Sequence, residues 1–173
     1  MKVIAGLGNP ERTHENNRHN VGFMFLDYIS EQLQIDLWES SDRFLGDYIK
    51  TDKLFLLKPN TYMNSSGKAI QSVLSYYKID PTNLFIVHDD LDIKLGEYKI
   101  VPAKGPKLHG GINSIEEQLG TGDFTRVRVG VDNRNSDNRV EGITYVLQDF
   151  EPQEMKVLAE VFPKIWSELE KGL

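Results

Sequence analysis

The sequence predicts an α/β fold: a single domain over residues 1–173, with a twisted, mostly parallel, mixed β-sheet flanked by helices in three α/β/α layers. Three observations lead to this prediction. Short apolar runs alternate along the chain with stretches of helical periodicity. No Pro-, Gly- or Ser-rich linker divides the chain. Two strand-like runs in the first half are close enough to form an antiparallel hairpin, which makes the sheet mixed.

The first half of the chain predicts a strand, a polar loop, a helix, a hairpin and a second helix. The apolar run 3–5 is the first strand, and helical spacing follows over 20–34 with Asn20 as its N-cap. Strands over 44–49 and 54–57 are joined by a tight turn at 51–53. The next helix is expected to begin at a capping side chain within 64–66.

The second half continues the alternation of strands and helices. The run 84–87 is continuously apolar, which is typical of a buried central strand, and acidic residues follow it. Strands are expected over 96–101 and 126–131, and helices over 112–119, 140–147 and 154–169.

Composition excludes several classes of function. The chain has no cysteine, which excludes disulfides, thiolate metal sites and a cysteine nucleophile. No apolar run approaches the roughly 20 residues of a bilayer span, and no signal peptide is recognisable, so we expect a cytoplasmic protein without a membrane segment. The net charge of −6 disfavours indiscriminate nucleic-acid binding. A local basic stretch still contains Lys94, Lys99, Lys104 and Lys107.

The loop within residues 6–23 is the first candidate for chemistry. It carries His14, Arg18 and His19 between a strand and a helix, where a histidine is well placed to act as a general base. Its glycines also resemble a dinucleotide-binding turn, but the third glycine of that pattern is replaced by Glu11, whose charge would repel a pyrophosphate. The remaining alternative is that His19 only ends the loop and has no chemical role.

Two further polar segments follow predicted strands. Asn64 is either a helix cap or, like Asn9, an amide at the edge of the sheet that offers a donor and an acceptor. The segment with Asp89, Asp90 and Asp92 suits a divalent metal, because Mg²⁺ prefers oxygen ligands. Alternatively, one aspartate hydrogen-bonds His19 and fixes its tautomer. The residues by themselves leave both alternatives open.

Three segments in register resemble the bacterial-type peptidyl-tRNA hydrolase family: GLGNP…RHNVGF, KPNTYMNSSGKA and VHDDLDIKLG. The similarity extends through GTGDFTRVRVGV. It implies hydrolysis of the ester between a peptide and the 3′-terminal ribose of tRNA, which recycles tRNA in translation and in ribosome rescue. It also implies no cofactor, no metal and a monomeric protein whose partner is peptidyl-tRNA.

The resemblance implies roles for individual residues. His19 matches the base that activates water, and Asp89 matches the residue that orients it. Asn9 matches the position that distinguishes N-blocked peptidyl groups from free aminoacyl groups. Tyr62, Met63 and Asn64 match substrate-binding positions, and Tyr62 offers a ring that can stack on the terminal adenine. The expected tRNA contacts are His14 in the first loop, with Lys104 and Lys107.

The sequence departs from the family pattern at three positions. His14 replaces a tyrosine and Glu11 replaces a glycine. Gly110, at a substrate-binding position, replaces an asparagine that contacts substrate and helps to position the water. Losing one polar donor from such a site costs on the order of 10²-fold in rate. Gly110 therefore motivates an alternative function, a catalytically weak tRNA-binding relative, in which Gly110→Asn is expected to raise activity. A metal-dependent hydrolase that uses the three aspartates is a third hypothesis.

Overall fold

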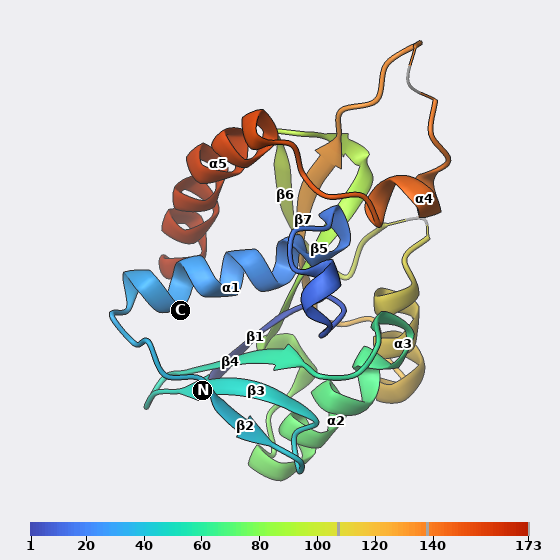
Figure 1. The fold of residues 1–173 in the computed structure, drawn as a ribbon. Helices are drawn as coiled ribbons and strands as arrows, with labels where there is room; N and C mark the ends of the chain where they lie inside the picture. Colours follow the sequence, from blue (N-terminus) through green and yellow to red (C-terminus); the bar gives the residue numbers. More distant parts are fainter. Residues whose placement is uncertain (107, 138, 173) are drawn as a thin grey trace.

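The computed structural model describes residues 1–106, 108–137 and 139–172 (Figure 1). Seven strands form one mixed sheet in the order β2-β3-β4-β1-β5-β7-β6. The strands are β1 (Lys2–Gly6), β2 (Glu39–Ser41), β3 (Gly46–Lys50), β4 (Leu54–Pro59), β5 (Leu84–Lys94), β6 (Tyr98–Pro102) and β7 (Thr125–Asp132). The central strands β4, β1, β5 and β7 are parallel, and antiparallel pairs extend both edges.

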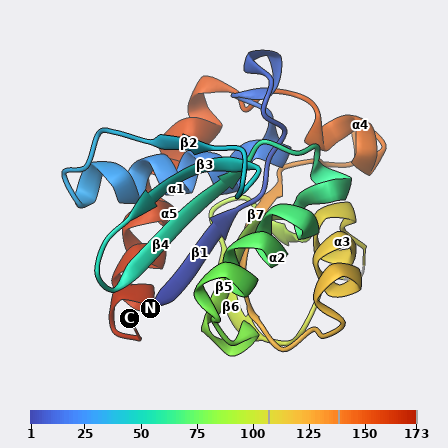
Figure 2. The ribbon, with the colours of Figure 1, turned by 90° about the horizontal axis from the view of Figure 1, so that it is seen from below.

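Helices cover both faces of this sheet (Figure 2). The α-helices are α1 (Val21–Gln32), α2 (Ser66–Tyr77), α3 (Gly110–Leu119), α4 (Gly142–Val146) and α5 (Pro152–Glu170), and the 3-10 turns are η1 (Arg12–His14), η2 (Arg18–Asn20), η3 (Met63–Ser65) and η4 (Pro81–Asn83). Helices α1 and α5 lie on one face, and α2 and α3 on the other. The predicted three-layer α/β/α architecture is confirmed.

The residues of β1 show why both faces must be covered. Ile4 packs into the core on the α1 and α5 side, whereas Val3 and Ala5 pack into the core on the α2 and α3 side. Successive side chains of a strand point to opposite faces, so a continuously apolar strand requires a helical layer on each side. None of the described helices is both long and apolar enough to cross a membrane.

The strand predicted over 84–87 is longer than expected, because β5 continues through the acidic segment to Lys94. Its neighbour β1 ends at Gly6, opposite Val87. Beyond that point β7 alone pairs with His88, Asp89 and Asp90. Asp89 therefore projects from a rigid strand at the place where the adjacent strand has stopped.

The loop between β1 and α1 is held near Asp89 because α1 packs closely against the sheet. A Cβ at Gly22 would lie 2.5 Å from Leu7 N and from Val87 O, so only glycine lets α1 approach β1 and β5 so closely. Gly6 also faces Gly22, because a Cβ at Gly6 would clash with the Gly22 carbonyl, so this glycine serves helix–strand packing.

The two predicted capping positions are confirmed, but the capping hydrogen bonds are not. Asn20 and Ser65 are at the N-caps of α1 and α2, but neither side chain makes a capping hydrogen bond. Each α-helix instead continues from a 3-10 turn, η2 or η3, which already bonds the first backbone groups. The Asn20 and Asn64 side chains are consequently free of a capping role.

The edges of the sheet and the C-terminal helices also differ from the prediction. Strand β2 was missed, because three exposed or half-exposed polar residues at an edge carry no apolar alternation. Helix α4 is shorter than predicted. Helix α5 is longer and begins at Pro152, where Glu154 Oε2 accepts a hydrogen bond from Glu151 N at 2.8 Å.

Candidate active site

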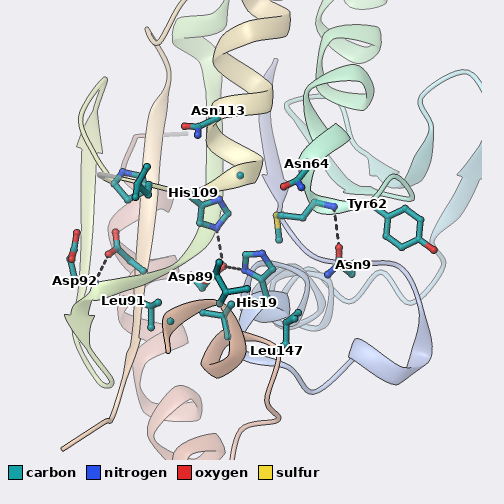
Figure 3. A pocket seen from close by; sticks show the side chains of 18 residues that line it. Asn9, His19, Tyr62, Asn64, Asp89, Leu91, Asp92, His109, Asn113 and Leu147 are labelled. Carbon is teal, nitrogen blue, oxygen red and sulfur yellow. Dashed lines mark hydrogen bonds and ion pairs between the residues drawn. The ribbon is translucent and has the colours of Figure 1, made fainter. Parts of the chain in front are cut away.

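A pocket of about 800 Å³ opens beside the ends of β1 and β5 (Figure 3). Residues that lie far apart in the sequence converge on it. Its lining includes Asn9, His19, Tyr62, Met63, Asn64, Asp89, Asp90, Leu91, Asp92, Pro106, Leu108, His109, Gly110, Asn113, Gly142, Ile143, Val146 and Leu147. Most of the predicted site residues are thus brought together.

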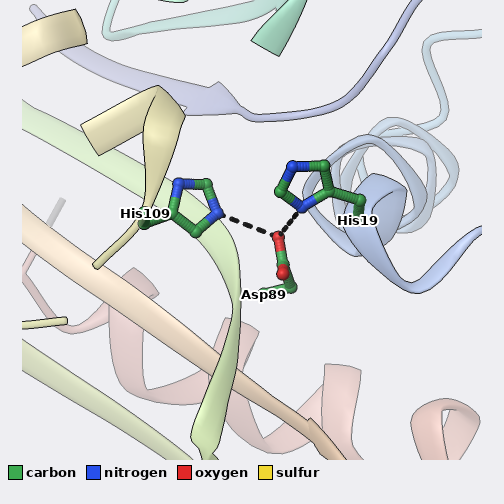
Figure 4. Close-up of side chains that lie close together, drawn as sticks. All are labelled: His19, Asp89 and His109. Atoms are coloured by element: carbon green, nitrogen blue, oxygen red, sulfur yellow. Dashed lines mark hydrogen bonds and ion pairs between the residues drawn. The ribbon is translucent and has the colours of Figure 1, made fainter. Parts of the chain in front are cut away.

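His19 and Asp89 meet at the base of this pocket (Figure 4). His19 Nδ1 lies 2.7 Å from Asp89 Oδ1. The Asp89 side chain is 3% exposed and that of His19 is 17% exposed. The second ring nitrogen of His19, Nε2, is directed away from the carboxylate. Because Asp89 accepts the Nδ1 proton, Nε2 is left as the basic atom.

His109 is a second partner of Asp89 that the sequence analysis missed. Its Nε2 lies 3.0 Å from Asp89 Oδ1, the same oxygen that His19 contacts. His109 Nδ1 accepts hydrogen bonds from Gly111 N and Ile112 N at the start of α3, so the proton is on Nε2 and is donated to Asp89. The sequence signal that could have identified His109 is its position as a polar residue immediately before a predicted helix.

This arrangement sets the protonation of the site. Burial acts to raise the pKa of Asp89, but His109 and His19 outweigh it, so the pKa lies below its ordinary value. Burial acts to lower the pKa of His19, and the charge and hydrogen bond of Asp89 overcome this effect and raise it. The buried neighbour His88 has its pKa lowered to about 3, first by burial and then by His109.

Asn9 is held in one orientation at the rim of the dyad. Its Oδ1 accepts the Met63 backbone N–H at 3.0 Å. Asn20 fixes the Asn9 backbone by accepting from its N–H and donating to its carbonyl, each at 2.9 Å. Since the Asn9 oxygen is occupied, its amide N–H groups remain as the donors available to a ligand.

The remaining predicted substrate-binding residues take different positions around the pocket. The Met63 side chain is buried, so Met63 acts at the rim through its backbone. Asn64 is exposed on the wall. Tyr62 is 61% exposed, and its hydroxyl donates to Glu11 Oε1 at 2.5 Å, which holds the ring at the entrance. Gly110 lies in the wall beside Asn64.

Two predicted tRNA contacts lie outside the pocket lining, and one cannot be placed. His14 Nδ1 is 2.8 Å from Asn17 Oδ1, and its ring does not line the pocket. Lys104 is exposed, two residues before the lining residue Pro106. Lys107 is outside the described residues.

The three aspartates of β5 do not converge. Asp90 Oδ2 accepts from Arg128 Nε at 2.6 Å, and its Oδ1 accepts from Asp92 N. Successive side chains of a strand point to opposite faces of the sheet, so the Asp90 carboxylate points away from the Asp89 carboxylate. Within the described ranges, the one group of three residues suited to a metal is His19, Asp89 and His109, whose atoms already hydrogen-bond one another.

Arg18 connects the first loop to the C-terminal region, and the sequence analysis did not predict this connection. It is 4% exposed and pairs with Glu154 at 2.6 Å. Its guanidinium also donates to the carbonyls of Gln148 and Asp149 and lies 4.1 Å from the centre of the Tyr145 ring. The position of His19 therefore depends on contacts more than 125 residues away in the sequence.

The outer wall of the pocket is apolar. It combines Leu91, Leu108 and three side chains of the α4 region, Ile143, Val146 and Leu147. Leu108 and Ile143 are 87% and 73% exposed. Exposed apolar side chains that border a cavity are typical of a ligand-binding surface.

The comparisons with known proteins agree with this geometry. A family model described as "Peptidyl-tRNA hydrolase" matches residues 3–173. The chain is 37% identical to the peptidyl-tRNA hydrolase of Bacillus subtilis, covering 95% of this chain and 87% of that one. It is 40% identical to that of Bacillus cytotoxicus, covering 90% and 83%. The crystal structure of the peptidyl-tRNA hydrolase of Acinetobacter baumannii is similar with a TM-score of 0.81 at 28% identity, covering 94% of this chain and 83% of that one.

Proposed function

This chain belongs to the peptidyl-tRNA hydrolase family, and from this membership and the geometry of the pocket we infer its mechanism. The chain is an enzyme, a hydrolase of peptidyl-tRNA, and the alternative of a catalytically weak tRNA-binding relative is not favoured. The observation that carries the mechanism is the 2.7 Å contact between His19 Nδ1 and Asp89 Oδ1 inside a pocket that also presents Asn9.

In this mechanism His19 is the general base. Its Nε2 removes a proton from a water molecule, and the water oxygen attacks the carbonyl carbon of the ester. The tetrahedral intermediate collapses by breaking the bond between that carbon and the ribose 3′-oxygen. This oxygen takes the proton from His19, which leaves a free tRNA 3′-hydroxyl and a peptide carboxylic acid. The acid then releases its proton to solvent and becomes a carboxylate. Asp89 keeps the imidazole oriented and stabilises its positive form.

We propose that Asn9 selects N-blocked substrates. Its oxygen is bonded to the Met63 backbone, so the amide presents only N–H donors to the pocket. A peptide carbonyl accepts such a donor. A free α-ammonium group is itself a donor and leaves both groups unpaired, which costs affinity.

The other walls of the pocket suit the two ends of the substrate. The apolar wall of Leu91, Leu108, Ile143, Val146 and Leu147 suits peptide side chains. At the entrance, the Tyr62 ring can stack on a terminal base, and Lys104 lies two residues from the rim, where it can contact a phosphate. Asn64 offers an amide between them.

We propose that the protein acts in the cytoplasm as a monomer and recycles tRNA in ribosome rescue. Peptidyl-tRNA is made by ribosomes, which places the substrate in that compartment. All the side chains assigned to the mechanism come from one chain, so no partner subunit is needed to complete the site. Sedimentation at micromolar concentration tests the monomer.

The deciding experiment is single-turnover hydrolysis of an N-acetylated aminoacyl-tRNA in the presence of a chelator. The parent is expected to cleave it, and His19→Ala is expected to lose activity. Asn16→Ala is the matched control, because Asn16 is an exposed residue of the same loop that lies outside the pocket lining, and it should retain activity within a few-fold. Full activity of His19→Ala refutes the mechanism.

Two further arms of the same assay test specificity and tRNA contact. Asn9→Ala should reduce the ratio of blocked to unblocked substrate cleavage, whereas Asn16→Ala, an exposed amide in the same loop, should not. Lys104→Ala should reduce the slope of log affinity against log salt by about 1, as expected for one phosphate contact. Lys164→Ala, on α5, should leave that slope unchanged. A tRNA affinity independent of salt contradicts the electrostatic contact.

A further inference from the structure

Two consecutive glycines at the start of α3, Gly110 and Gly111, lie against two consecutive residues of η3, Asn64 and Met63. A Cβ at Gly111 would lie 2.7 Å from Leu7 Cδ1 and from Met63 Sδ, both of which belong to buried core residues. A Cβ at Gly110 would lie closer than 3.0 Å to Asn64 Oδ1, a separation that Cβ atoms in real structures essentially never show. The first glycine makes room for a pocket side chain and the second for the core.

The carboxamide of the exposed Asn64 side chain lies against Gly110. Within residues 1–106, 108–137 and 139–172, no hydrogen bond to the Asn64 side chain is formed. Its oxygen lies against the first turn of α3, where the partial positive charge of the helix favours an acceptor. With the oxygen on the helix side, the amide N–H groups are left for the pocket.

We propose that Gly110 is a positioning residue for substrate hydrolysis, because its missing side chain is the space in which the Asn64 oxygen lies. Any side chain at position 110 displaces the Asn64 amide from its place in the pocket wall. This inference rests on the proposed function, in which Asn64 contacts substrate. It also reverses the sequence-based expectation for Gly110→Asn, which should lower the rate rather than raise it.

The size of the effect follows from the geometry. A methyl group at position 110 requires the Asn64 oxygen to move by about 1 Å before it reaches ordinary contact distance, and a misplacement of that size costs on the order of 10- to 100-fold in rate. The atom that must move is the far end of a flexible side chain, so the fold itself is not strained. Alanine also loses less conformational entropy in a helix than glycine does.

The test is a double-mutant cycle on kcat/KM with Gly110→Ala, Asn64→Ala and the double variant. Gly110→Ala should lose on the order of 10- to 100-fold in the parent background. In the Asn64→Ala background, which lacks the displaced group, it should change the rate by less than about twofold. Full activity of Gly110→Ala, or an equal loss in both backgrounds, overturns the proposal.

Thermal unfolding separates positioning from damage to the fold. Gly110→Ala should keep or slightly raise the melting temperature. Gly111→Ala, the neighbouring glycine, meets Leu7 and Met63 in the core and should lower it. A large fall in the melting temperature of Gly110→Ala contradicts the role assigned to it.

A structural readout decides the inference even if the mechanism fails. The side-chain amide signals of Asn64 in a ¹⁵N–¹H spectrum, assigned by their loss in Asn64→Ala, should shift in Gly110→Ala. They should stay in place in Gly172→Ala, whose nearest contact is an ordinary 3.6 Å. Unshifted signals in Gly110→Ala refute the inference. An inactive parent, or an active His19→Ala, refutes the proposed mechanism instead.

Discussion

Replacing Asp89 by asparagine tests the centre of the mechanism. The substitution keeps the size of the side chain and removes its charge. In the parent, one oxygen, Oδ1, accepts from His19 at 2.7 Å and from His109 at 3.0 Å. An amide either offers one uncharged oxygen to both donors or places its own N–H groups against both of them. Its pairing with His19 is therefore weakened in either orientation.

The expected loss follows from that contact. A hydrogen bond to a charged group contributes about 1.5–3 kcal/mol, which corresponds to a factor of about 10–150 in rate if it is lost in the transition state. In a Ser-His-Asp triad, where the wrong histidine tautomer is also stabilised, the loss is about 10⁴-fold. We therefore expect kcat of Asp89→Asn to fall by at least about 100-fold.

The pH dependence of kcat/KM supplies a second and independent test of the role of Asp89. His19 must be neutral to act as a base, so activity rises with pH through its pKa. In the parent, burial lowers this pKa and Asp89 more than offsets the effect. Without the carboxylate only the lowering by burial remains. The acid limb of the kcat/KM profile should thus move to lower pH while the plateau falls.

The assay is the pH profile of single-turnover hydrolysis, with Asp92→Asn as the control. Asp92 belongs to the same strand but is exposed and does not contact His19, so its variant should keep the profile of the parent. An Asp89→Asn plateau within threefold of the parent, or an acid limb that moves to higher pH, would refute the role given to Asp89.

Three other predictions concern stability and the entrance of the pocket. Glu154→Gln should lower the free energy of unfolding in urea by about 3 kcal/mol because Arg18 remains buried without its anionic partner, whereas the exposed Glu160→Gln should not. Because the folded-state pKa of His88 is about 3 and its ordinary value is 6.5, the unfolded chain binds the extra proton below pH 6.5. Stability should fall by about 1.4 kcal/mol per pH unit well below 6.5, and less steeply in His88→Asn, as measured by urea titrations from pH 6.5 to 4. Tyr62→Phe should bind peptidyl-tRNA like the parent and Tyr62→Ala about tenfold more weakly, as one lost stacking contact predicts; equal binding by the two variants would argue against stacking.

Much of the fold was predictable because local patterns report burial directly. The apolar runs of β1, β4 and β5 required a sheet covered on both faces, and the periodic segments supplied the helices. The apolar pattern did not predict the edge strand β2, because its residues are exposed or half-exposed and polar. It also failed for β5 beyond Val87, where pairing with β7, rather than side-chain character, keeps the acidic segment extended.

The candidate site was predicted in outline. His19, Asp89, Asn9 and Asn64 were selected as polar residues that follow strands and by their resemblance to one family, and the structure gathers them in one pocket. The resemblance also suggested that Gly110 is a deficiency. The structure places the Asn64 oxygen over that glycine, so the meaning of the substitution depends on a neighbour 46 positions away that no local pattern identifies.

By itself the sequence determined the layered α/β fold, the absence of disulfides and the candidate residues for the chemistry. The tertiary structure alone decided their relations: the two histidines that share Asp89, the opposed directions of Asp89 and Asp90, and the anchoring of Arg18 by Glu154. The physical reason is that periodicity and composition record whether a residue is buried. Which side chain it meets is fixed only when distant segments pack together.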